Sequence, residues 1–301
     1  MAAGGLMIPL ISVLMPVFNA TDTLPLALAS LQAQTYDAWQ CIIVDDGSTD
    51  NPEHIINAVG DSRIQCRRLD RNYGRGHARQ YALEMAQGKY IAFLDADDWV
   101  YPDKFQDQVE LLEAEPDVAM VSTGMAIANT NDQLVGVRCS NRSAPVMRPL
   151  MKHPGMPPLA FAPSMIRADL AKQTGFDTTF PIAEDADFLL RALLGRQFAV
   201  LPTPLYVYRE QGSTTLNKVS SALDYCCRMF QKQLDQYPLD SAIEIVKARG
   251  KQMIYRSAAT LGLWDHMIAR RSRIPNDADY QQYQHAWQTI SAIAAEYALA
   301  V

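Results

Sequence analysis

Two apolar runs in the first hundred residues end abruptly in adjacent carboxylates. The runs span residues 39–44 and 90–94, and they are followed directly by Asp45-Asp46 and by Asp95-Ala96-Asp97-Asp98. Short apolar runs rich in β-branched residues are typical of buried strands. Carboxylates at strand ends are costly to desolvate unless they bind something, and open α/β sheets bind ligands beyond the carboxyl ends of their strands. The pattern predicts a site for a sugar or nucleotide, a metal, or both.

The first half of the chain alternates between strand and helix patterns. Apolar runs predict strands, residues at helical spacing predict helices between them, and Gly88 is a typical helix terminator. In order, the expected elements are a strand at 11–18, a helix at 24–34, a strand at 39–44, a helix after 52, a strand at 64–69, a helix at 77–86 and a strand at 90–94. This alternation predicts an α/β fold with a mainly parallel, Rossmann-like sheet and helices on both faces.

The second half is less regular and ends in helices. A helix is expected at 102–115, a strand at 118–122, a helix at 185–194 and a strand at 199–208. Residues 129–163 show poor periodicity and form either a mobile loop or strands near the substrate. Residues 215–301 carry helical patterns throughout. We therefore expect an α/β domain over residues 1–212 and a helical C-terminal extension over 213–301. The extension either simply packs on the domain or contacts an acceptor, a membrane or another subunit.

Charge and cysteine usage exclude some classes of protein. The formal net charge is −6 and no long Lys/Arg run occurs, which argues against a nucleic-acid partner. The five cysteines show no CxxC spacing, and residues 1–7 do not resemble a secretory leader, so a reduced, cytoplasmic compartment is expected. The cluster Arg270-Arg271-Ser272-Arg273 is either a solvated turn or a peripheral contact with anionic lipid at the inner face of a membrane. The oligomeric state is left open.

Three carboxylates within four residues form the strongest candidate metal site. Asp95, Asp97 and Asp98 repel one another and need cations or donors nearby. Carboxylate oxygens suit hard ions such as Mg²⁺ or Mn²⁺, which proteins often hold with one or two carboxylates plus substrate phosphates. A solvated acidic loop is the alternative, and Asp46-Gly47 is also a common turn sequence.

Two further segments carry charged residues at predicted helix starts. Gly74 to Arg79 lacks the third glycine of a dinucleotide fingerprint and the ending of a P-loop, so both are rejected. Arg75 and Arg79 either contact a phosphate or are solvated. Glu184 and Asp185 precede an apolar helix, where acids either favour the helix dipole or act as a general base.

The ordered set of motifs identifies a family. The chain resembles the family 2 inverting glycosyltransferases with the GT-A fold over roughly residues 9–212. Any one motif is weak, but the order and spacing are specific. The motifs are Val13-Leu14-Met15-Pro16-Val17-Phe18-Asn19, Ile42-Ile43-Val44-Asp45-Asp46-Gly47-Ser48-Thr49-Asp50, Asn72-Tyr73-Gly74, Phe93-Leu94-Asp95-Ala96-Asp97-Asp98 and Glu184-Asp185.

The resemblance implies roles for the strand-end carboxylates. Asp45 matches the position that binds the nucleobase, with Asp46 beside it. Asp95 matches the ribose-side acid of the DXD motif, and Asp97 matches the acid that ligates Mn²⁺ or Mg²⁺. These roles together imply a nucleotide-sugar pocket, most often one for a UDP-sugar.

The resemblance also implies a catalytic pair and a wider pocket. Asp185 matches the catalytic base, and Glu184 supports it. Many relatives carry a His shortly after the Tyr-Arg that corresponds to Tyr208-Arg209; this chain reads Glu210-Gln211-Gly212-Ser213 there, which puts a His metal ligand in doubt. The other residues expected at the nucleotide-sugar are Pro16, Val17, Asn19, Asn72, Arg75, Arg79, Ala96 and Arg209.

The implied activity is transfer of a sugar from a nucleotide-sugar to an acceptor hydroxyl in glycan or polysaccharide biosynthesis. The acceptor would be a glycan, a lipid-linked or a protein-linked molecule. One alternative is a non-catalytic subunit that binds sugar nucleotides. A nucleotidyltransferase is disfavoured because the first strand is followed by Pro16-Val17-Phe18-Asn19 and not by a glycine-rich basic loop.

Overall fold

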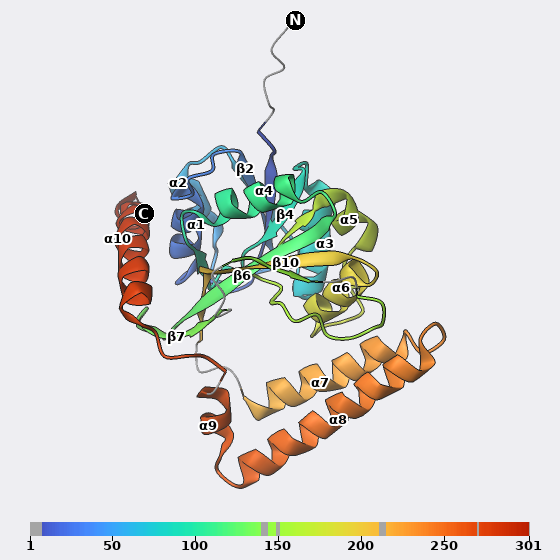
Figure 1. Cartoon of the computed structure of the whole chain (residues 1–301). Helices are drawn as coiled ribbons and strands as arrows, with labels where there is room; N and C mark the ends of the chain where they lie inside the picture. Colours follow the sequence, from blue (N-terminus) through green and yellow to red (C-terminus); the bar gives the residue numbers. More distant parts are fainter. Residues whose placement is uncertain (1–7, 140–143, 149–150, 211–214, 270, 301) are drawn as a thin grey trace, which may run out of the picture.

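The computed structural model describes residues 8–139, 144–148, 151–210, 215–269 and 271–300. The expectations on residues 1–7, on Arg270 and on the missing His at 211–213 lie outside these residues. A central sheet is covered by helices on both faces, and a pair of long helices projects away from it (Figure 1). The α/β fold class and the C-terminal helices are thus confirmed.

One half of the sheet is entirely parallel. Its strands are β1 (Ile11–Val17), β2 (Trp39–Asp45), β3 (Ile64–Arg68) and β4 (Tyr90–Phe93), in the spatial order β3-β2-β1-β4. Almost every residue of β1, β2 and β4 is buried, as expected for strands covered on both faces. Because these strands are parallel and in register, their carboxyl ends meet at one edge of the sheet.

Successive side chains of these strands enter two separate cores. Val13 and Cys41 belong to a core shared with α1 (Leu24–Gln32), α2 (Glu53–Val59) and α4 (Lys104–Ala114). Leu14 and Ile42 belong to a core on the opposite face, shared with α3 (Arg75–Met85), α5 (Ala168–Thr174) and α6 (Glu184–Leu193). The period of two residues explains why the runs are apolar throughout and show no alternation.

The other half of the sheet mixes strand directions. The long strands β6 (Val118–Ala128) and β10 (Gln197–Arg209) pair in parallel. Four short antiparallel strands extend them: β5 (Trp99–Val100), β7 (Leu134–Arg138), β8 (Val146–Arg148) and β9 (Met165–Arg167). β7 and β8 agree with the strand alternative for residues 129–163, whereas β5 and β9 were not expected. β9 bridges β4 and β6, so one continuous sheet forms. The strand predicted at 118–122 is also longer than expected and reaches residue 128.

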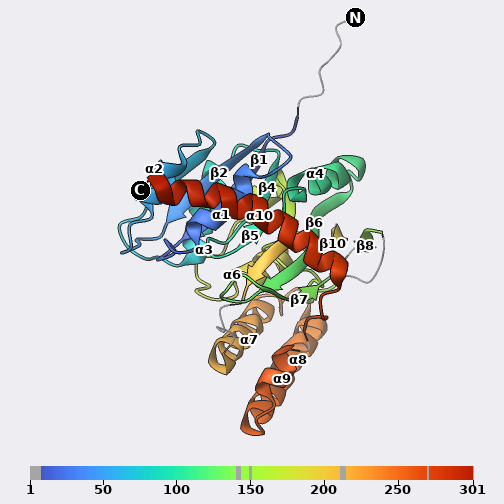
Figure 2. The same ribbon diagram turned by 90° about the vertical axis from the view of Figure 1, so that its left-hand side faces the viewer.

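The C-terminal helices form two parts with different surroundings. α7 (Leu216–Gln231) and α8 (Pro238–Thr260) form a hairpin that projects from the body (Figure 1), and α9 (Trp264–Ala269) turns the chain back. α10 (Asp277–Ala300) then runs across α1 and α2 (Figure 2). In the described part of the chain, no helix is both long enough and apolar enough to cross a membrane.

The last helix shares the core of the α/β domain. Tyr283, Ala286 and Ile290 are at most 4% exposed and lie in the same core as β1 and α1. The ring of Tyr283 lies 5.3 Å from that of Trp99 in β5. The α7–α8 hairpin, by contrast, meets the body through Met229 and Phe230, which pack beside α6. The predicted extension is therefore half core helix and half projecting hairpin.

Candidate active site

A cleft of about 1010 Å³ opens at the carboxyl edge of the parallel strands. Its walls come from the ends of β1 and β4, the starts of α3 and α6, and residues 156–163. The structure brings together most of the predicted site residues in this lining: Pro16, Val17, Asn19, Asp46, Asn72, Arg75, Arg79, Asp95, Ala96, Asp97 and Asp185. Asp45, Glu184 and Arg209 are not part of the lining.

The loop after β1 is fastened to the loop after β2. Asn19 has a left-handed backbone (φ 49°), its amide N–H donates to Ser48 Oγ over 3.0 Å, and its Oδ1 accepts from the Thr49 amide over 2.8 Å. Gly47 has φ +73°, and a Cβ there would lie 2.6 Å from the carbonyl carbon of Arg71. Glycine is therefore required where the 47–50 loop meets the 71–74 loop.

The Asp45-Asp46 pair is buried and bonded mainly to backbone. Both carboxylates are 2% exposed. Asp45 Oδ1 accepts from the Ser48 amide over 2.8 Å, and its Oδ2 lies 3.7 Å from Arg68 Nε. Asp46 accepts from the amides of Tyr73 (2.7 Å) and Gly74 (2.8 Å), which holds the loop before α3 against the cleft. The nucleobase role of Asp45 stays a prediction.

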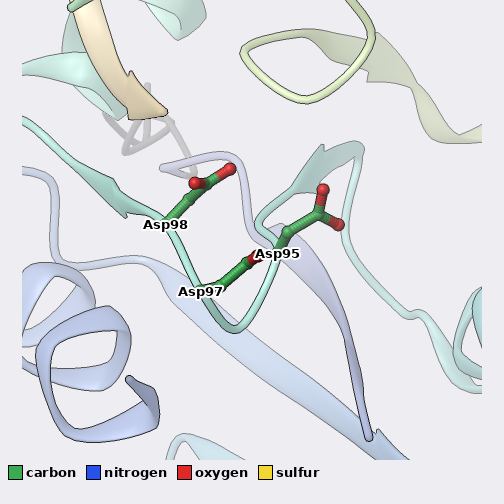
Figure 3. A group of neighbouring side chains, drawn as sticks. All are labelled: Asp95, Asp97 and Asp98. Atoms are coloured by element: carbon green, nitrogen blue, oxygen red, sulfur yellow. The ribbon is translucent and has the colours of Figure 1, made fainter. Parts of the chain in front are cut away.

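The three carboxylates after β4 lie close together on one short loop (Figure 3). A ligand oxygen from each of Asp95, Asp97 and Asp98 lies within 4.8 Å of the other two. Asp98 is 1% exposed, and its oxygens accept from the Tyr206 hydroxyl (2.7 Å) and the Arg209 amide (2.9 Å). Burial has the largest effect on the pKa of Asp98 and, together with the charges of Asp97 and Asp95, raises it well above its ordinary value.

These bonds make Asp98 an anchor and leave Asp95 and Asp97 at the cleft. Asp98 fastens the acidic loop to β10, whereas Asp95 and Asp97 face the cleft. Burial and the charge of Asp95 raise the pKa of Asp97, although the charges of Arg209 and Arg75 act in the opposite direction, so a cation beside this carboxylate would be favourable. Carboxylate oxygens are the ligands that hard divalent cations such as Mg²⁺ or Mn²⁺ prefer.

A buried arginine joins the acidic loop to the start of α6. Arg79 is 3% exposed and donates to Asp95 Oδ1 over 2.6 Å and to Glu184 Oε1 over 2.5 Å. Arg75 Nε reaches the same Glu184 oxygen at 2.7 Å. Burial alone would lower the pKa of Arg79, but the charges of Asp95 and Glu184 outweigh it and raise that pKa. Arg79 therefore stays charged and connects the two acidic segments.

Glu184 is a support for this connection and lies behind the cleft. Its side chain is fully buried, and its Oε2 has no hydrogen-bond partner among the described residues. Burial raises the pKa of Glu184, although the two arginines act in the opposite direction. The structure thus places Glu184 where it can orient arginine side chains beneath the cleft.

Asp185 sits in the first turn of α6 and faces the cleft. Its Oδ1 accepts from the Ala186 amide over 2.8 Å, and its side chain is partly exposed. Ala183, just before the helix, has a left-handed backbone (φ 65°). This turn presents Asp185 to the cavity while Glu184 points inward. The two adjacent carboxylates therefore have different surroundings: Asp185 borders the cavity, and Glu184 is buried.

Arg209 is held away from the cleft by an acid that the sequence did not point to. Its guanidinium binds both oxygens of Asp132 at 2.6 and 2.5 Å. It is still near enough to Asp97 for its charge to act against the raised pKa of that group. A diphosphate contact by Arg209 stays a prediction, since it requires a ligand to compete with Asp132.

Several lining residues were missed by sequence reasoning. Tyr208 lies two residues after Tyr206 on β10, so the strand period would have placed it on the same side. Arg138 and Phe161 come from the stretch with poor periodicity, which offered no signal. The guanidinium of Arg79 stacks 4.8 Å from the centre of the Phe161 ring, a contact between segments that only the fold brings together.

Similarity to known proteins extends over most of the chain. WfaP of Escherichia coli, a UDP-Glc:alpha-D-GlcNAc-diphosphoundecaprenol beta-1,3-glucosyltransferase, is 42% identical over 108 residues, which is 35% of this chain and 42% of that protein. The succinoglycan biosynthesis protein ExoO of Rhizobium meliloti is 26% identical over 284 residues, covering 88% of this chain and 79% of ExoO. The chain spans less than half the length of the first curated relatives that it matches.

Solved structures with the same fold include a UDP-GlcNAc complex and a mannosyltransferase. TarS 1–349 of S. aureus in complex with UDP-GlcNAc aligns with a TM-score of 0.65 at 18% identity, covering 95% of this chain and 81% of TarS. The mannosyltransferase PcManGT of Pyrobaculum calidifontis in complex with GDP-Man and Mn²⁺ aligns with a TM-score of 0.55 at 17% identity, covering 98% and 87%. These similarities confirm the GT-A type of fold.

The family itself is shown by a match along the sheet that forms the cleft. The family model described as Glycosyl transferase family 2 matches residues 12–175, more than half of the chain, from β1 to the end of α5. The matched region contains the loops after β1, β2 and β4 that surround the cavity. This chain therefore belongs to glycosyl transferase family 2.

Proposed function

We propose that this protein transfers a sugar from a nucleotide-sugar to an acceptor hydroxyl during polysaccharide assembly. The observation that carries the proposal is a single cavity bordered by Asp46, by Asp95 and Asp97, and by Asp185. These groups have separate uses in such a reaction: holding the nucleoside, holding the divalent ion that would neutralise the leaving group, and accepting a proton. The names of the similar proteins, among them a glucosyltransferase and a succinoglycan biosynthesis protein, support this reading.

The donor is proposed to be a UDP-sugar. Its nucleoside would lie between the segment after β1 and the Asp46 loop, and its ribose near Asp95. Asp97, with Asp95, would hold Mg²⁺ or Mn²⁺, which neutralises charge on the departing diphosphate. Support comes from TarS, which binds UDP-GlcNAc, and from PcManGT, whose complex contains Mn²⁺. Arg75, half-exposed at the rim, provides a further positive charge for phosphate oxygens.

The proposed chemistry is one displacement with inversion at the anomeric carbon. The acceptor hydroxyl forms the new bond to that carbon as the bond to the diphosphate breaks, and its proton passes to the Asp185 carboxylate. Glu184 and Arg79 act beneath this point, because their ion pair fixes the first turn of α6 against the acidic loop. No enzyme nucleophile is needed.

A lipid-linked acceptor and a cytoplasmic location complete the proposal. WfaP, by its name, glucosylates GlcNAc linked to diphosphoundecaprenol, which favours a lipid-linked acceptor over a free glycan or a protein. All five cysteines are free, and Cys41 is fully buried in β2. Unpaired thiols are expected where the surroundings are reducing.

Release of UDP from a panel of UDP-sugars with Mn²⁺ or Mg²⁺ tests this function. The Asp185→Asn and Asp97→Ala variants should each lower turnover by roughly 10²- to 10⁴-fold. Asp169→Asn is a matched control: Asp169 also lies in the first turn of a helix, and its Oδ1 also bonds the next amide at 2.8 Å, but it lies outside the cleft. Full turnover in both cleft variants would overturn the assignment, and donor binding without any transfer would identify a non-catalytic subunit.

A further inference from the structure

An apolar stripe runs along the outer side of the α7–α8 hairpin. Four α8 side chains in it are at least 61% exposed, and the stripe continues past the end of α8 onto Leu261 at 72%. The spacing of three, four and seven residues places them on one side of the helix. The α8 members are Leu239, Val246, Met253 and Ile254, with Ile243 at 44% between them.

The opposite side of α8 is already occupied. Ser241, Ala248 and Tyr255 are at most 9% exposed, and Gln252 Nε2 donates to Ser220 Oγ of α7 over 2.8 Å. α7 lies between α8 and the α/β body (Figure 1). The stripe therefore faces away from the protein, and no described segment of the chain covers it.

Basic side chains border the stripe. Lys247 and Lys251 follow one border, and Arg249 and Arg256 follow the other, by their positions on the helix. The two acids of α8 are engaged with neighbours: Glu244 with Lys247 at 2.6 Å, and Asp240 with His153 at 3.1 Å. Arg249 is likewise paired with Asp224 of α7, which leaves Lys251 and Arg256 as the basic border residues that are paired with no acid in the described part of the chain. An apolar face with cationic borders is the pattern of a helix that lies in a membrane interface, where long basic side chains reach the phosphates.

The size of the stripe argues against a second copy of the chain as its partner. A helix of this length is about 35 Å long and about 10 Å wide, so the stripe offers on the order of 350 Å² of surface. A stable dimer buries about 800 Å² on each partner. The basic borders would also face each other in a symmetric pair of α8 helices, which is unfavourable.

We propose that the α8 stripe lies on an anionic phospholipid bilayer. The apolar side chains enter the boundary between headgroups and acyl chains. Lys251 and Arg256, which are paired with no acid among the described residues, contact lipid phosphates. Because α7 packs through Phe230 on α6, whose first turn holds Asp185, this contact brings the cleft close to the membrane surface. Binding of α8 to a bilayer requires neither the nucleotide-sugar nor turnover, so its test is independent of the proposed reaction.

Flotation of the full chain with vesicles tests the surface directly. The wild type should float with phosphatidylcholine vesicles that contain about 30% phosphatidylglycerol. Val246→Glu with Met253→Glu should lower the bound fraction at least about tenfold. The matched control, Val135→Glu with Met147→Glu, changes two exposed apolar residues outside α8 and should bind like the wild type. Equal loss in both double variants would overturn the proposal.

Two further measurements, of charge dependence and of self-association, distinguish a membrane-binding stripe from a dimer interface. Lys251→Gln with Arg256→Gln should weaken binding to the anionic vesicles roughly tenfold and change little with phosphatidylcholine alone. Light scattering after size exclusion, without vesicles, should give one mass for the wild type and for Val246→Glu with Met253→Glu. A wild-type dimer that this variant converts to monomer would contradict the proposal and assign the stripe to a second copy.

Discussion

The cleft and the α8 helix depart from the usual distribution of side chains in opposite ways. In the cleft, Arg79 and Glu184 are charged groups taken out of water, at 3% and 0% exposure. On α8, Val246 and Met253 are apolar groups left in water, at 71% and 70% exposure. Both arrangements are unfavourable in isolation.

The two regions differ in whether contacts within the folded chain offset this unfavourable free energy. The cleft pairs its buried charges internally, through bonds of 2.5 to 2.7 Å among Arg75, Arg79, Glu184 and Asp95, so the site is organised before any ligand arrives. The described residues offer α8 no such compensation. The charges of the cleft are therefore preorganised, whereas the exposed apolar side chains of α8 are of the kind that mark an interaction surface.

Breaking the ion pairs of the cleft should have the largest effect on stability. Arg79→Met keeps most of the side-chain length but leaves Glu184 buried with less positive charge, and should lower the free energy of unfolding by about 4 kcal/mol. Urea denaturation measures this change. Arg75→Met removes the half-exposed partner of the same Glu184 oxygen and should cost less than about 1 kcal/mol. Similar losses in the two variants would refute an internally organised cleft.

Removing the anchor of the hairpin should have a smaller and local effect. Phe230 is 1% exposed between α7 and α6, so Phe230→Ala should cost about 3 kcal/mol. Amide hydrogen exchange should show lost protection in α7 and α8 and retained protection in α10, which shares the main core. Leu239→Ala, at a side chain that is 71% exposed, is the control and should change nothing. Uniform loss of protection would mean that hairpin and domain unfold as one unit.

The smallest expected effect is a pH dependence of hairpin docking. Burial alone would raise the pKa of Asp177, but its bonds with Lys232 of α7 and with Thr179 outweigh burial and lower that pKa to about 2. A lowered pKa means that the ion pair stabilises the folded state above the ordinary pKa of 3.8 and loses this contribution as the pH falls toward 2. Lys232 is half-exposed, so the gain is below about 1 kcal/mol.

The measurement is α7 exchange protection in wild type and in Asp177→Asn. The two should differ at about pH 5 and converge as the pH falls toward about 2. A difference that grows as the pH falls would have the wrong sign for this ion pair.

The sequence was sufficient for the parallel half of the fold and for most of the cleft lining. Strands such as Trp39–Asp45 are buried on both faces, so their apolar composition alone identifies them as strands. Their in-register ends then bring acids that are distant in the sequence to one edge of the sheet. The resemblance to family 2 then gave Asp185, which the strand argument could not reach, since it sits on a helix.

The remainder depends on contacts that no local pattern encodes. β9 has three residues, too few to show a period, yet it joins the two halves of the sheet. The pairing of Arg209 with Asp132 joins the end of β10 to the turn before β7. Helical spacing predicted α10, but its partner α1 lies more than two hundred residues earlier in the chain, and the choice of partner is a property of the assembled core.

The most direct test of the central claim separates donor binding from turnover in the same cleft. Calorimetric titration with UDP and Mn²⁺ should show that Asp97→Ala weakens metal-dependent UDP binding at least about tenfold. Asp185→Asn should bind UDP like the wild type while its sugar transfer falls roughly 10²- to 10⁴-fold. Unchanged UDP affinity in Asp97→Ala, or a loss of UDP affinity in Asp185→Asn that matches its loss of turnover, would contradict the division of the cleft into a donor-holding acid pair and a catalytic base.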